Sequence, residues 1–268
     1  MKTSQVKYER DEKIGRVTLT RPDTMNALSE DLMEELFQKL RQANADSETR
    51  VLIIGGEGKH FCAGGDLNWE GDLDEESSTR LLRLTGHLSF ELRNGPKPTI
   101  GAIRGYCLGG GNELNLHLDL AIASETARFS QPETRWGVLP FWNTPQLLPL
   151  MIGDRRAREV LMMGRMYDAA QAYELGLVNL VVPDDELEAE ANSWADELCE
   201  RSPTSLRLVK LALNSAADAL RGAANHEAAL VSTTAGSARY QAEVHDFFET
   251  DPSQRRPTPA WPERVRRS

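Results

Sequence analysis

Hydrophobic and polar positions along this chain predict strands and helices in turn. Short apolar runs that stop at glycine, proline or a polar turn predict strands over 17–20, 51–54, 99–103, 121–123 and 177–182. Residues 72–94 are charged with a helical tendency, the glycine-rich turn at 108–111 opens a helix over 112–118, and further helices are predicted over 155–163 and 169–175, the last with Gly176 as its C-cap. Strands that alternate with helices are typical of an α/β fold with largely parallel pairing.

The clearest amphipathic helix follows Ser29. Serine is a preferred N-cap, and Glu30 and Asp31 suit the positive end of the helix dipole. One helical stripe then collects the apolar residues Leu32, Met33, Leu36, Phe37 and Leu40. We therefore expect this helix to pack one face against the sheet.

The last third of the chain has a different pattern. After Pro183 it is helical almost throughout, over 185–201, 203–220 and about 222–248, and it ends in a proline-rich basic segment. We therefore expect two regions: a core over 1–184 and a helical C-terminal region over 185–268 that packs on its own core or on a neighbouring subunit.

Composition indicates a globular protein of the cytoplasm. The 268 residues are 40% hydrophobic and 27% charged, which is enough for a core without disulfides or metal. Three scattered cysteines (62, 107 and 199) fit a reducing compartment and suit neither a disulfide framework nor a zinc site. The polar N-terminus does not resemble a signal peptide, and no apolar run approaches the length of a membrane span. We expect no metal and no membrane association.

The net charge is −10, which argues against a nucleic-acid partner. The charge is unevenly distributed, because residues 251–268 carry +3 and the first 250 residues carry −13. The chain is thus an acidic body with a basic tail.

Two glycine-rich corners, at 62–66 and 108–111, each follow a buried apolar strand. Glycine lets the backbone approach a ligand, and two free amides aimed at one point form an oxyanion hole. The candidates are the amides of Gly65 and Gly110; the alternative is that these are ordinary turn glycines. The run 109–111 fits neither the dinucleotide-binding pattern nor a P-loop.

Two glutamates follow the second corner. Glu113 comes three residues after Gly110, one turn up the same helix face, and Glu133 follows Gln131-Pro132 in a predicted loop. A paired acid and base around a polarised carbonyl suits a hydrolase or a lyase. The alternatives are a helix-start glutamate that serves the dipole and a solvated loop acid. Sequence spacing alone does not bring 113 and 133 together.

The sequence resembles the enoyl-CoA hydratase/isomerase (crotonase) family. The resemblance runs from about 14 to 214 and rests on five stretches in family order: Asn26-Ala27-Leu28-Ser29, 61–67 (FCAGGDL), 105–114 (GYCLGGGNEL), 127–133 (ARFSQPE) and 172–183 around Gly176-Leu177-Val178-Asn179. It implies a spiral of β-β-α units with a helical C-terminal region that builds homotrimers or homohexamers. It also implies an acyl-CoA substrate, with coenzyme A as part of that substrate and no other cofactor.

The resemblance also implies roles for individual residues. The oxyanion hole maps onto the amides of Gly65 and Gly110, and the two catalytic glutamates of the family's hydratases map onto Glu113 and Glu133. Glu113 is then the base that activates water for attack at Cβ, and Glu133 the proton donor to Cα. Both glutamates are present, which favours an enoyl-CoA hydratase of the two-glutamate type. Corner residues expected to line the substrate are Ala63, Asp66, Leu67, Leu108 and Gly109.

One segment departs from the family pattern. Where the hydratases continue into small, glycine-rich residues, this chain has Phe141 and Trp142. With Trp69 and Trp136 they would form an aromatic wall that suits a bulky or cyclic acyl group; the alternative is core packing. Residues 155–214 also resemble the family branch that acts on ring-bearing acyl-CoAs, whose members usually lack both glutamates.

Two other functions stay open. One is a different crotonase reaction on the same enolate: double-bond isomerisation, C–C hydrolysis or decarboxylation. The other is a catalytically idle, oligomeric binding or scaffold protein. In either case the basic tail has a candidate role, because coenzyme A carries phosphates that cations would bind. Phe248 (or its neighbour Phe247), Arg255 and Arg256 are the candidates, against the alternative of a solvated tail.

Overall fold

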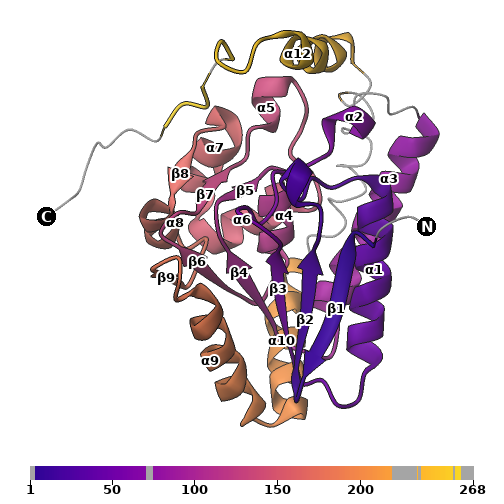
Figure 1. Cartoon of the computed structure of the whole chain (residues 1–268), viewed down its shortest axis with the longest axis vertical. Coiled ribbons are helices and arrows are strands. Elements are labelled where there is room, and N and C mark those ends of the chain that lie inside the picture. Colours follow the sequence, from indigo (N-terminus) through magenta and orange to yellow (C-terminus); the bar gives the residue numbers. More distant parts are fainter. Residues whose placement is uncertain (1–3, 71–74, 219–233, 235–236, 256, 261–268) are drawn as a thin grey trace, which may run out of the picture.

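A six-stranded sheet forms the centre of this computed structural model, which describes residues 4–70, 75–218, 234, 237–255 and 257–260 (Figure 1). Its strands, in spatial order, are β1 (Val6–Asp11), β2 (Ile14–Leu19), β3 (Val51–Gly56), β4 (Thr99–Ile103), β6 (Leu120–Ser124) and β9 (Leu180–Val182). Only β1 and β2 pair antiparallel; the other four pairings are parallel, as the sequence predicted. β1 escaped prediction because its residues are mostly charged and exposed.

A second, three-stranded sheet lies beside the glycine corners. It consists of β5 (Tyr106–Leu108), β7 (Arg128–Ser130) and β8 (Tyr167–Asp168). Strands this short carry too few alternating positions to be recognised in a sequence. The two sheets and the helices that connect their strands form the α/β fold that was expected.

Helices α1 (Glu30–Ala45) and α3 (Glu75–Arg93) pack together on one side of the sheet (Figure 1). The predicted cap is confirmed, because the amide of Leu32 donates to Ser29 Oγ at 3.3 Å. Four residues of the predicted stripe are buried, and Phe37 is partly buried against the core.

Shorter helices connect the strands around the glycine corners. They are η1 (Pro22–Thr24), α2 (Leu67–Glu70), α4 (Gly110–Leu116), α5 (Glu133–Trp136), α6 (Thr144–Ile152), α7 (Asp154–Met163) and α8 (Ala169–Leu175). α8 ends at Gly176 with φ of 86°, which confirms the predicted cap. The loop predicted around Glu133 is wrong: this residue begins α5.

The C-terminal region is helical, as expected, and begins as part of the core. α9 (Leu187–Cys199) packs on the sheet through Leu187, Ala191 and Ala195. α10 (Pro203–Asp218) follows, and α12 (Ala238–Glu249) lies over α5 at the top of Figure 1. Most of the predicted helix over 222–248 before α12 falls outside the described residues. α9 packs into the core of the sheet. The boundary between a core region and a C-terminal region at 184/185 stays a prediction.

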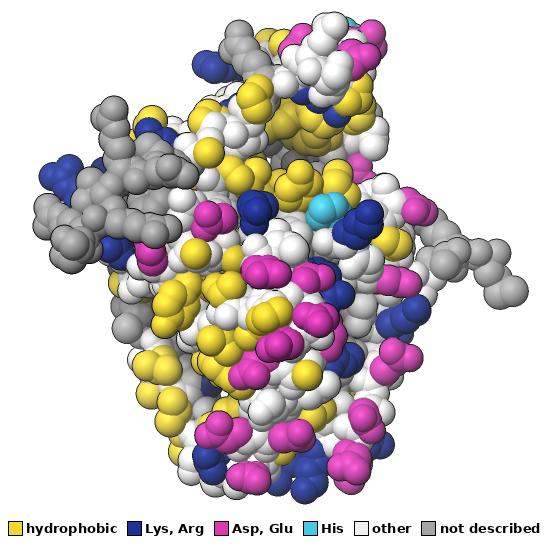
Figure 2. Space-filling view, turned by 60° about the vertical axis from the view of Figure 1, so that its left-hand side comes forward, with side chains coloured by type: hydrophobic (Ala, Val, Ile, Leu, Met, Phe, Trp, Pro, Cys, Tyr) yellow, Lys and Arg dark blue, Asp and Glu magenta, His cyan; other side chains and the backbone are white. Residues whose placement is uncertain are grey.

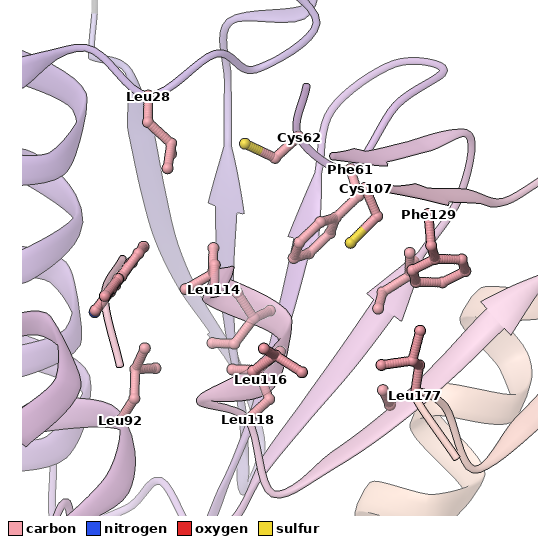
Figure 3. Packing of buried hydrophobic residues seen from close by; sticks show 14 of the residues in the cluster. Leu28, Phe61, Cys62, Leu92, Cys107, Leu114, Leu116, Leu118, Phe129 and Leu177 are labelled. Atoms are coloured by element: carbon pink, nitrogen blue, oxygen red, sulfur yellow. The ribbon is translucent and has the colours of Figure 1, made fainter. Parts of the chain in front are cut away.

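The main core gathers side chains from both sheets and from α4. Figure 3 shows Leu114 and Leu116 of α4 among Leu28, Phe61 and Phe129, and all five are at most 3% exposed. α4 is thereby fixed on its apolar side, and its first turn is held against the corners. Within the described residues no helix is long and apolar enough to cross a membrane.

Candidate active site

The two glycine corners lie side by side. Cys62 and Cys107 form a β-bridge, in which the amide of Leu108 donates to the Cys62 carbonyl at 3.0 Å. A side chain on Gly64, whose φ is 103°, would come within 2.9 Å of the Leu108 carbonyl oxygen and 3.5 Å of the Gly110 nitrogen. The first corner therefore needs glycine at position 64, because a Cβ there would push the two corners apart.

The amides of Gly65 and Gly110 are neighbours across this contact. A Cβ on Gly110 would lie 3.6 Å from the Gly65 nitrogen. Neither amide donates a hydrogen bond to any residue that the structure describes. Two adjacent backbone donors are what an oxyanion requires.

Glu113 lies one turn into α4 and is 1% exposed. Its Oε1 accepts hydrogen bonds from the Phe141 amide at 2.9 Å, Gln131 Nε2 at 3.2 Å and Thr144 Oγ1 at 3.3 Å. These donors come from two segments, around Gln131 and over 141–144, so the carboxylate is fixed in direction as well as in place.

Glu133 reaches the same place from α5. Its Oε1 accepts a hydrogen bond from Gln131 Nε2 at 3.1 Å. The same oxygen lies against Gly109, where a Cβ would be 2.8 Å away; Gly109 also has φ of 48°. Gly109 thus leaves the room that the second carboxylate occupies.

Gln131 joins the two carboxylates, and the sequence reasoning missed its role. It is fully buried, and its Nε2 donates to both Glu113 Oε1 and Glu133 Oε1. Asn112 Nδ2 donates to Gln131 Oε1 at 2.7 Å, which turns the Gln131 amino group toward the glutamates. Two carboxylates that share one donor lie close together although they are 20 residues apart. The only signal was the position of Gln131 two residues before Glu133, which by itself says nothing of a contact.

The substrate-lining candidates of the first corner surround its glycines. Ala63 binds the Met25 carbonyl through its amide at 3.0 Å. The Asp66 carboxylate forms an ion pair with Arg21 at 3.0 Å and is mostly buried, so it fastens the corner to the loop after β2. Leu67 and Trp69 belong to the short helix α2, and Trp69 packs partly buried against the core. Leu108 and Gly109 form the second corner beside them.

The aromatic segment divides into two parts. Phe141 is partly buried, and its amide binds Glu113, so this residue lies at the site. Trp142 is 3% exposed and belongs to the core, where its Nε1 donates to Ser89 Oγ at 2.8 Å. Trp142 therefore packs in the core, as the alternative had it, and its place in an aromatic wall of the acyl site stays a prediction.

The C-terminal segment reaches α5 of the same chain. The rings of Trp136 and Phe247 lie 5.3 Å apart, and the Arg255 guanidinium lies 3.8 Å above the Phe247 ring. Phe248 is 47% exposed and meets Phe247 edge-on. Figure 2 shows hydrophobic side chains gathered at the upper end of the molecule, where α12 lies. Arg256 falls outside the described residues.

Two buried titratable groups beside Glu113 and the glycine corners, His117 and Cys107, have shifted pKa values. Burial lowers the pKa of His117 to about 3, so its ring is neutral near pH 7. Burial also raises the pKa of the Cys107 thiol. In the described part of the chain, no three His, Cys, Asp or Glu side chains are grouped as metal ligands would be.

Residues 9–256 match the family model for enoyl-CoA hydratase/isomerase. The chain belongs to the enoyl-CoA hydratase/isomerase family. Its members act on acyl-CoA substrates, and membership confirms the crotonase-like fold that the motifs implied.

Solved structures agree with this family assignment. The chain is similar to an enoyl-CoA hydratase/isomerase from Xanthobacter autotrophicus Py2, with 32% identity, coverage of 91% of this chain and 93% of that one, and a TM-score of 0.83. It is also similar to a probable enoyl-CoA hydratase from Mycobacterium thermoresistibile, with 33% identity, 87% and 97% coverage and a TM-score of 0.79. An enoyl-CoA hydratase/isomerase from Mycobacterium paratuberculosis, at 24% identity with 91% and 98% coverage, shares the fold with a TM-score of 0.85.

Proposed function

We propose that this protein is an enoyl-CoA hydratase, which adds water across the 2,3 double bond of an enoyl-CoA thioester. One observation carries the proposal: the Gln131 amide holds Glu113 and Glu133 together beside the paired amides of Gly65 and Gly110. Isomerases and hydrolases of the family often keep one of these glutamates or neither, whereas a water addition uses both.

In the proposed reaction the thioester carbonyl accepts hydrogen bonds from the Gly65 and Gly110 amides. Glu113, as a carboxylate, takes a proton from water while the water oxygen bonds to Cβ, and the electron pair of the double bond moves into the thioester to form an enolate. Glu133, in its acid form, then gives a proton to Cα as the enolate collapses. The product carries OH at Cβ and H at Cα, and proton exchange with solvent returns both glutamates to their starting forms.

The proposed acyl group is bulky or cyclic. Phe141 supports this, because it places an aromatic residue directly beside Glu113. Trp142 packs in the core, so Phe141 is the member of this pair that carries the argument. Linear, branched, aromatic and alicyclic enoyl-CoAs, compared by kcat/KM, would rank the acyl classes.

The coenzyme A end and the assembly belong to the same proposal. Arg255 and Phe248 both contact Phe247, which packs on Trp136 of the helix that carries Glu133, and from there they would meet the phosphates and the adenine. α10 exposes Leu208, Val209 and Leu213 by 59%, 56% and 73%, which suits burial in a homotrimer or homohexamer. Sedimentation would give the assembly, and Arg255→Ala at low salt would raise KM for CoA esters. We further propose a cytoplasmic location and no cofactor beyond the substrate's own coenzyme A.

A substrate panel tests the reaction itself. Hydration is followed as loss of the conjugated thioester absorbance, with products identified by mass spectrometry. Glu113→Gln and Glu133→Gln should each lower kcat by about 10²–10⁴-fold, and Glu200→Gln, an exposed acid on α9's C-terminal side, should leave it unchanged. Isomerised or cleaved products in place of the hydrated one would show that the site catalyses another crotonase reaction. An absence of turnover on every ester would favour the idle scaffold.

A further inference from the structure

A chain of buried hydrogen bonds connects Trp142 to the backbone of Glu113. Trp142 Nε1 lies 2.8 Å from Ser89 Oγ, Ser89 Oγ lies 3.0 Å from His117 Nε2, and His117 Nδ1 lies 2.8 Å from the Glu113 carbonyl oxygen. All four residues are buried, with at most 6% exposure. They come from α3, α4 and the segment after α5, which the sequence separates widely.

Chemistry fixes the donor and the acceptor of each hydrogen bond in this series. A carbonyl oxygen only accepts, so His117 Nδ1 must carry the proton of that hydrogen bond. The buried ring is neutral, so Nε2 carries no proton and accepts from the Ser89 hydroxyl, whose single proton it shares with the Thr85 carbonyl oxygen at 2.8 Å. The indole N–H only donates, so it donates to Ser89 Oγ. The chain therefore runs in one direction, from Trp142 to Glu113.

The same segment also holds the carboxylate of Glu113. The Phe141 amide donates to Glu113 Oε1 at 2.9 Å, and Thr144 Oγ1 approaches the same oxygen at 3.3 Å. Residues 141–144 thus contact Glu113 directly at its side chain and, through Ser89 and His117, at its backbone.

The backbone of this segment adopts a conformation that Trp142 disfavours. Trp142 and Asn143 have φ of 52° and 63°, in the left-handed region, which asparagine tolerates but a bulky tryptophan rarely adopts. Something must hold them there, and the buried indole does so, since it lies 5.1 Å from the His117 ring and donates to Ser89. The Asn143 side chain hydrogen-bonds His117 as well.

We propose that Trp142, Ser89 and His117 form a positioning unit, which holds segment 141–144 so that the Phe141 amide meets the Glu113 carboxylate. The unit touches no substrate atom; it acts through Glu113 and Phe141. Its effect on rate rests on the proposed function, in which Glu113 is the base, whereas its effect on the Phe141 hydrogen bond does not.

Trp142→Phe tests the unit, because it keeps a buried aromatic ring and removes the indole donor. Trp194→Phe is the matched control: Trp194 Nε1 donates to Glu190 Oε1 at 2.8 Å on α9, away from the site. We expect Trp142→Phe to lower kcat about 10-fold with KM little changed, since a small displacement of a catalytic group acts on the chemical step. The control should change neither constant.

Ser89→Ala interrupts the same chain at its second member. Because both variants break one path, the double variant should lose no more kcat than the stronger single one. Additive losses would overturn the shared path, as would a kcat for Trp142→Phe within twofold of the wild type.

Nitrogen-15 NMR gives a readout that needs no turnover. The wild type should show neutral His117 protonated at Nδ1, and the Phe141 amide proton should move upfield in Trp142→Phe but not in Trp194→Phe. A His117 proton on Nε2, or an unmoved Phe141 amide, overturns the positioning unit even in an active enzyme. A wild type that hydrates no ester defeats the proposed function and leaves this NMR result to decide the unit by itself.

Discussion

Replacing Gln131 with methionine removes the donor that the two glutamates share. The side chain keeps nearly its length and stays apolar in a fully buried position, while the hydrogen bonds to Glu113 Oε1 at 3.2 Å and Glu133 Oε1 at 3.1 Å disappear. Asn112 Nδ2 also loses its acceptor, which lies 2.7 Å away.

The structure sets the size of the effect on rate. A hydrogen bond to a charged group contributes about 1.5–3 kcal/mol and one between neutral groups about 0.5–1.5 kcal/mol. Both contacts are long, so we take about 1.5 kcal/mol for the Glu113 carboxylate and about 0.5 kcal/mol for Glu133 in its acid form. Losing the first or both from the transition state then lowers kcat by about 10- to 30-fold, since about 1.4 kcal/mol is a factor of ten. Leaving the Asn112 donor buried without a partner should reduce the free energy of unfolding by about 1–3 kcal/mol.

Two measurements separate these effects. Initial rates at saturating enoyl-CoA give kcat, and urea denaturation gives the free energy of unfolding. Gln38→Met, on the exposed face of α1, is the control for a glutamine-to-methionine change and should alter neither. A Gln131→Met enzyme whose kcat stays within twofold of the wild type, when Glu113→Gln and Glu133→Gln are inactive, would refute the shared-donor reasoning.

Three further predictions concern single positions. Burial lowers the pKa of His117 from its usual 6.5 to about 3. Between these two pH values the unfolded chain therefore binds a proton at His117 that the folded protein does not bind. The contribution of the neutral His117 ring to the free energy of unfolding is complete above pH 6.5 and falls by up to about 1.4 kcal/mol per pH unit as the pH is lowered. In urea titrations, the free energy of unfolding of His117→Gln should therefore fall less steeply with decreasing pH than that of the wild type. Equal slopes would mean that the folded ring is protonated. Gly109→Ala places a Cβ 2.8 Å from Glu133 Oε1 at φ of 48°, so kcat should fall more than in Gly153→Ala, where the φ is also positive but open space surrounds the Cβ; equal rates would contradict this. Ser29→Ala removes the cap on the Leu32 amide and should lower the free energy of unfolding by about 0.5–2 kcal/mol with kcat unchanged, as thermal denaturation and steady-state kinetics would show.

Local chemistry explains which parts of the fold were predictable. The helix after Ser29, the cap at Gly176 and the buried strands β3 and β4 depend on neighbours in the sequence, and each is where the pattern placed it. The three-stranded sheet depends on pairings between distant segments, so no local signal marked it.

The site divides in the same way. Glycines at the corners and a glutamate one turn above Gly110 follow from spacing along one helix. The contact of Glu113 and Glu133 with one donor depends on Gln131, and the inward orientation of Trp142 depends on Ser89, which lies 53 residues earlier in the sequence. Such contacts are made by packing, which a hydrophobicity pattern does not describe.

The β-bridge between Cys62 and Cys107 places two fully buried thiols at the base of the glycine corners, whereas Cys199 is partly exposed. A thiol reagent added to the native protein therefore reaches Cys199 directly but reaches the other two only when the corners separate. The labelling rates of Cys62 and Cys107 would time the opening of the site, with Cys199 as the reference, without any probe having to be introduced.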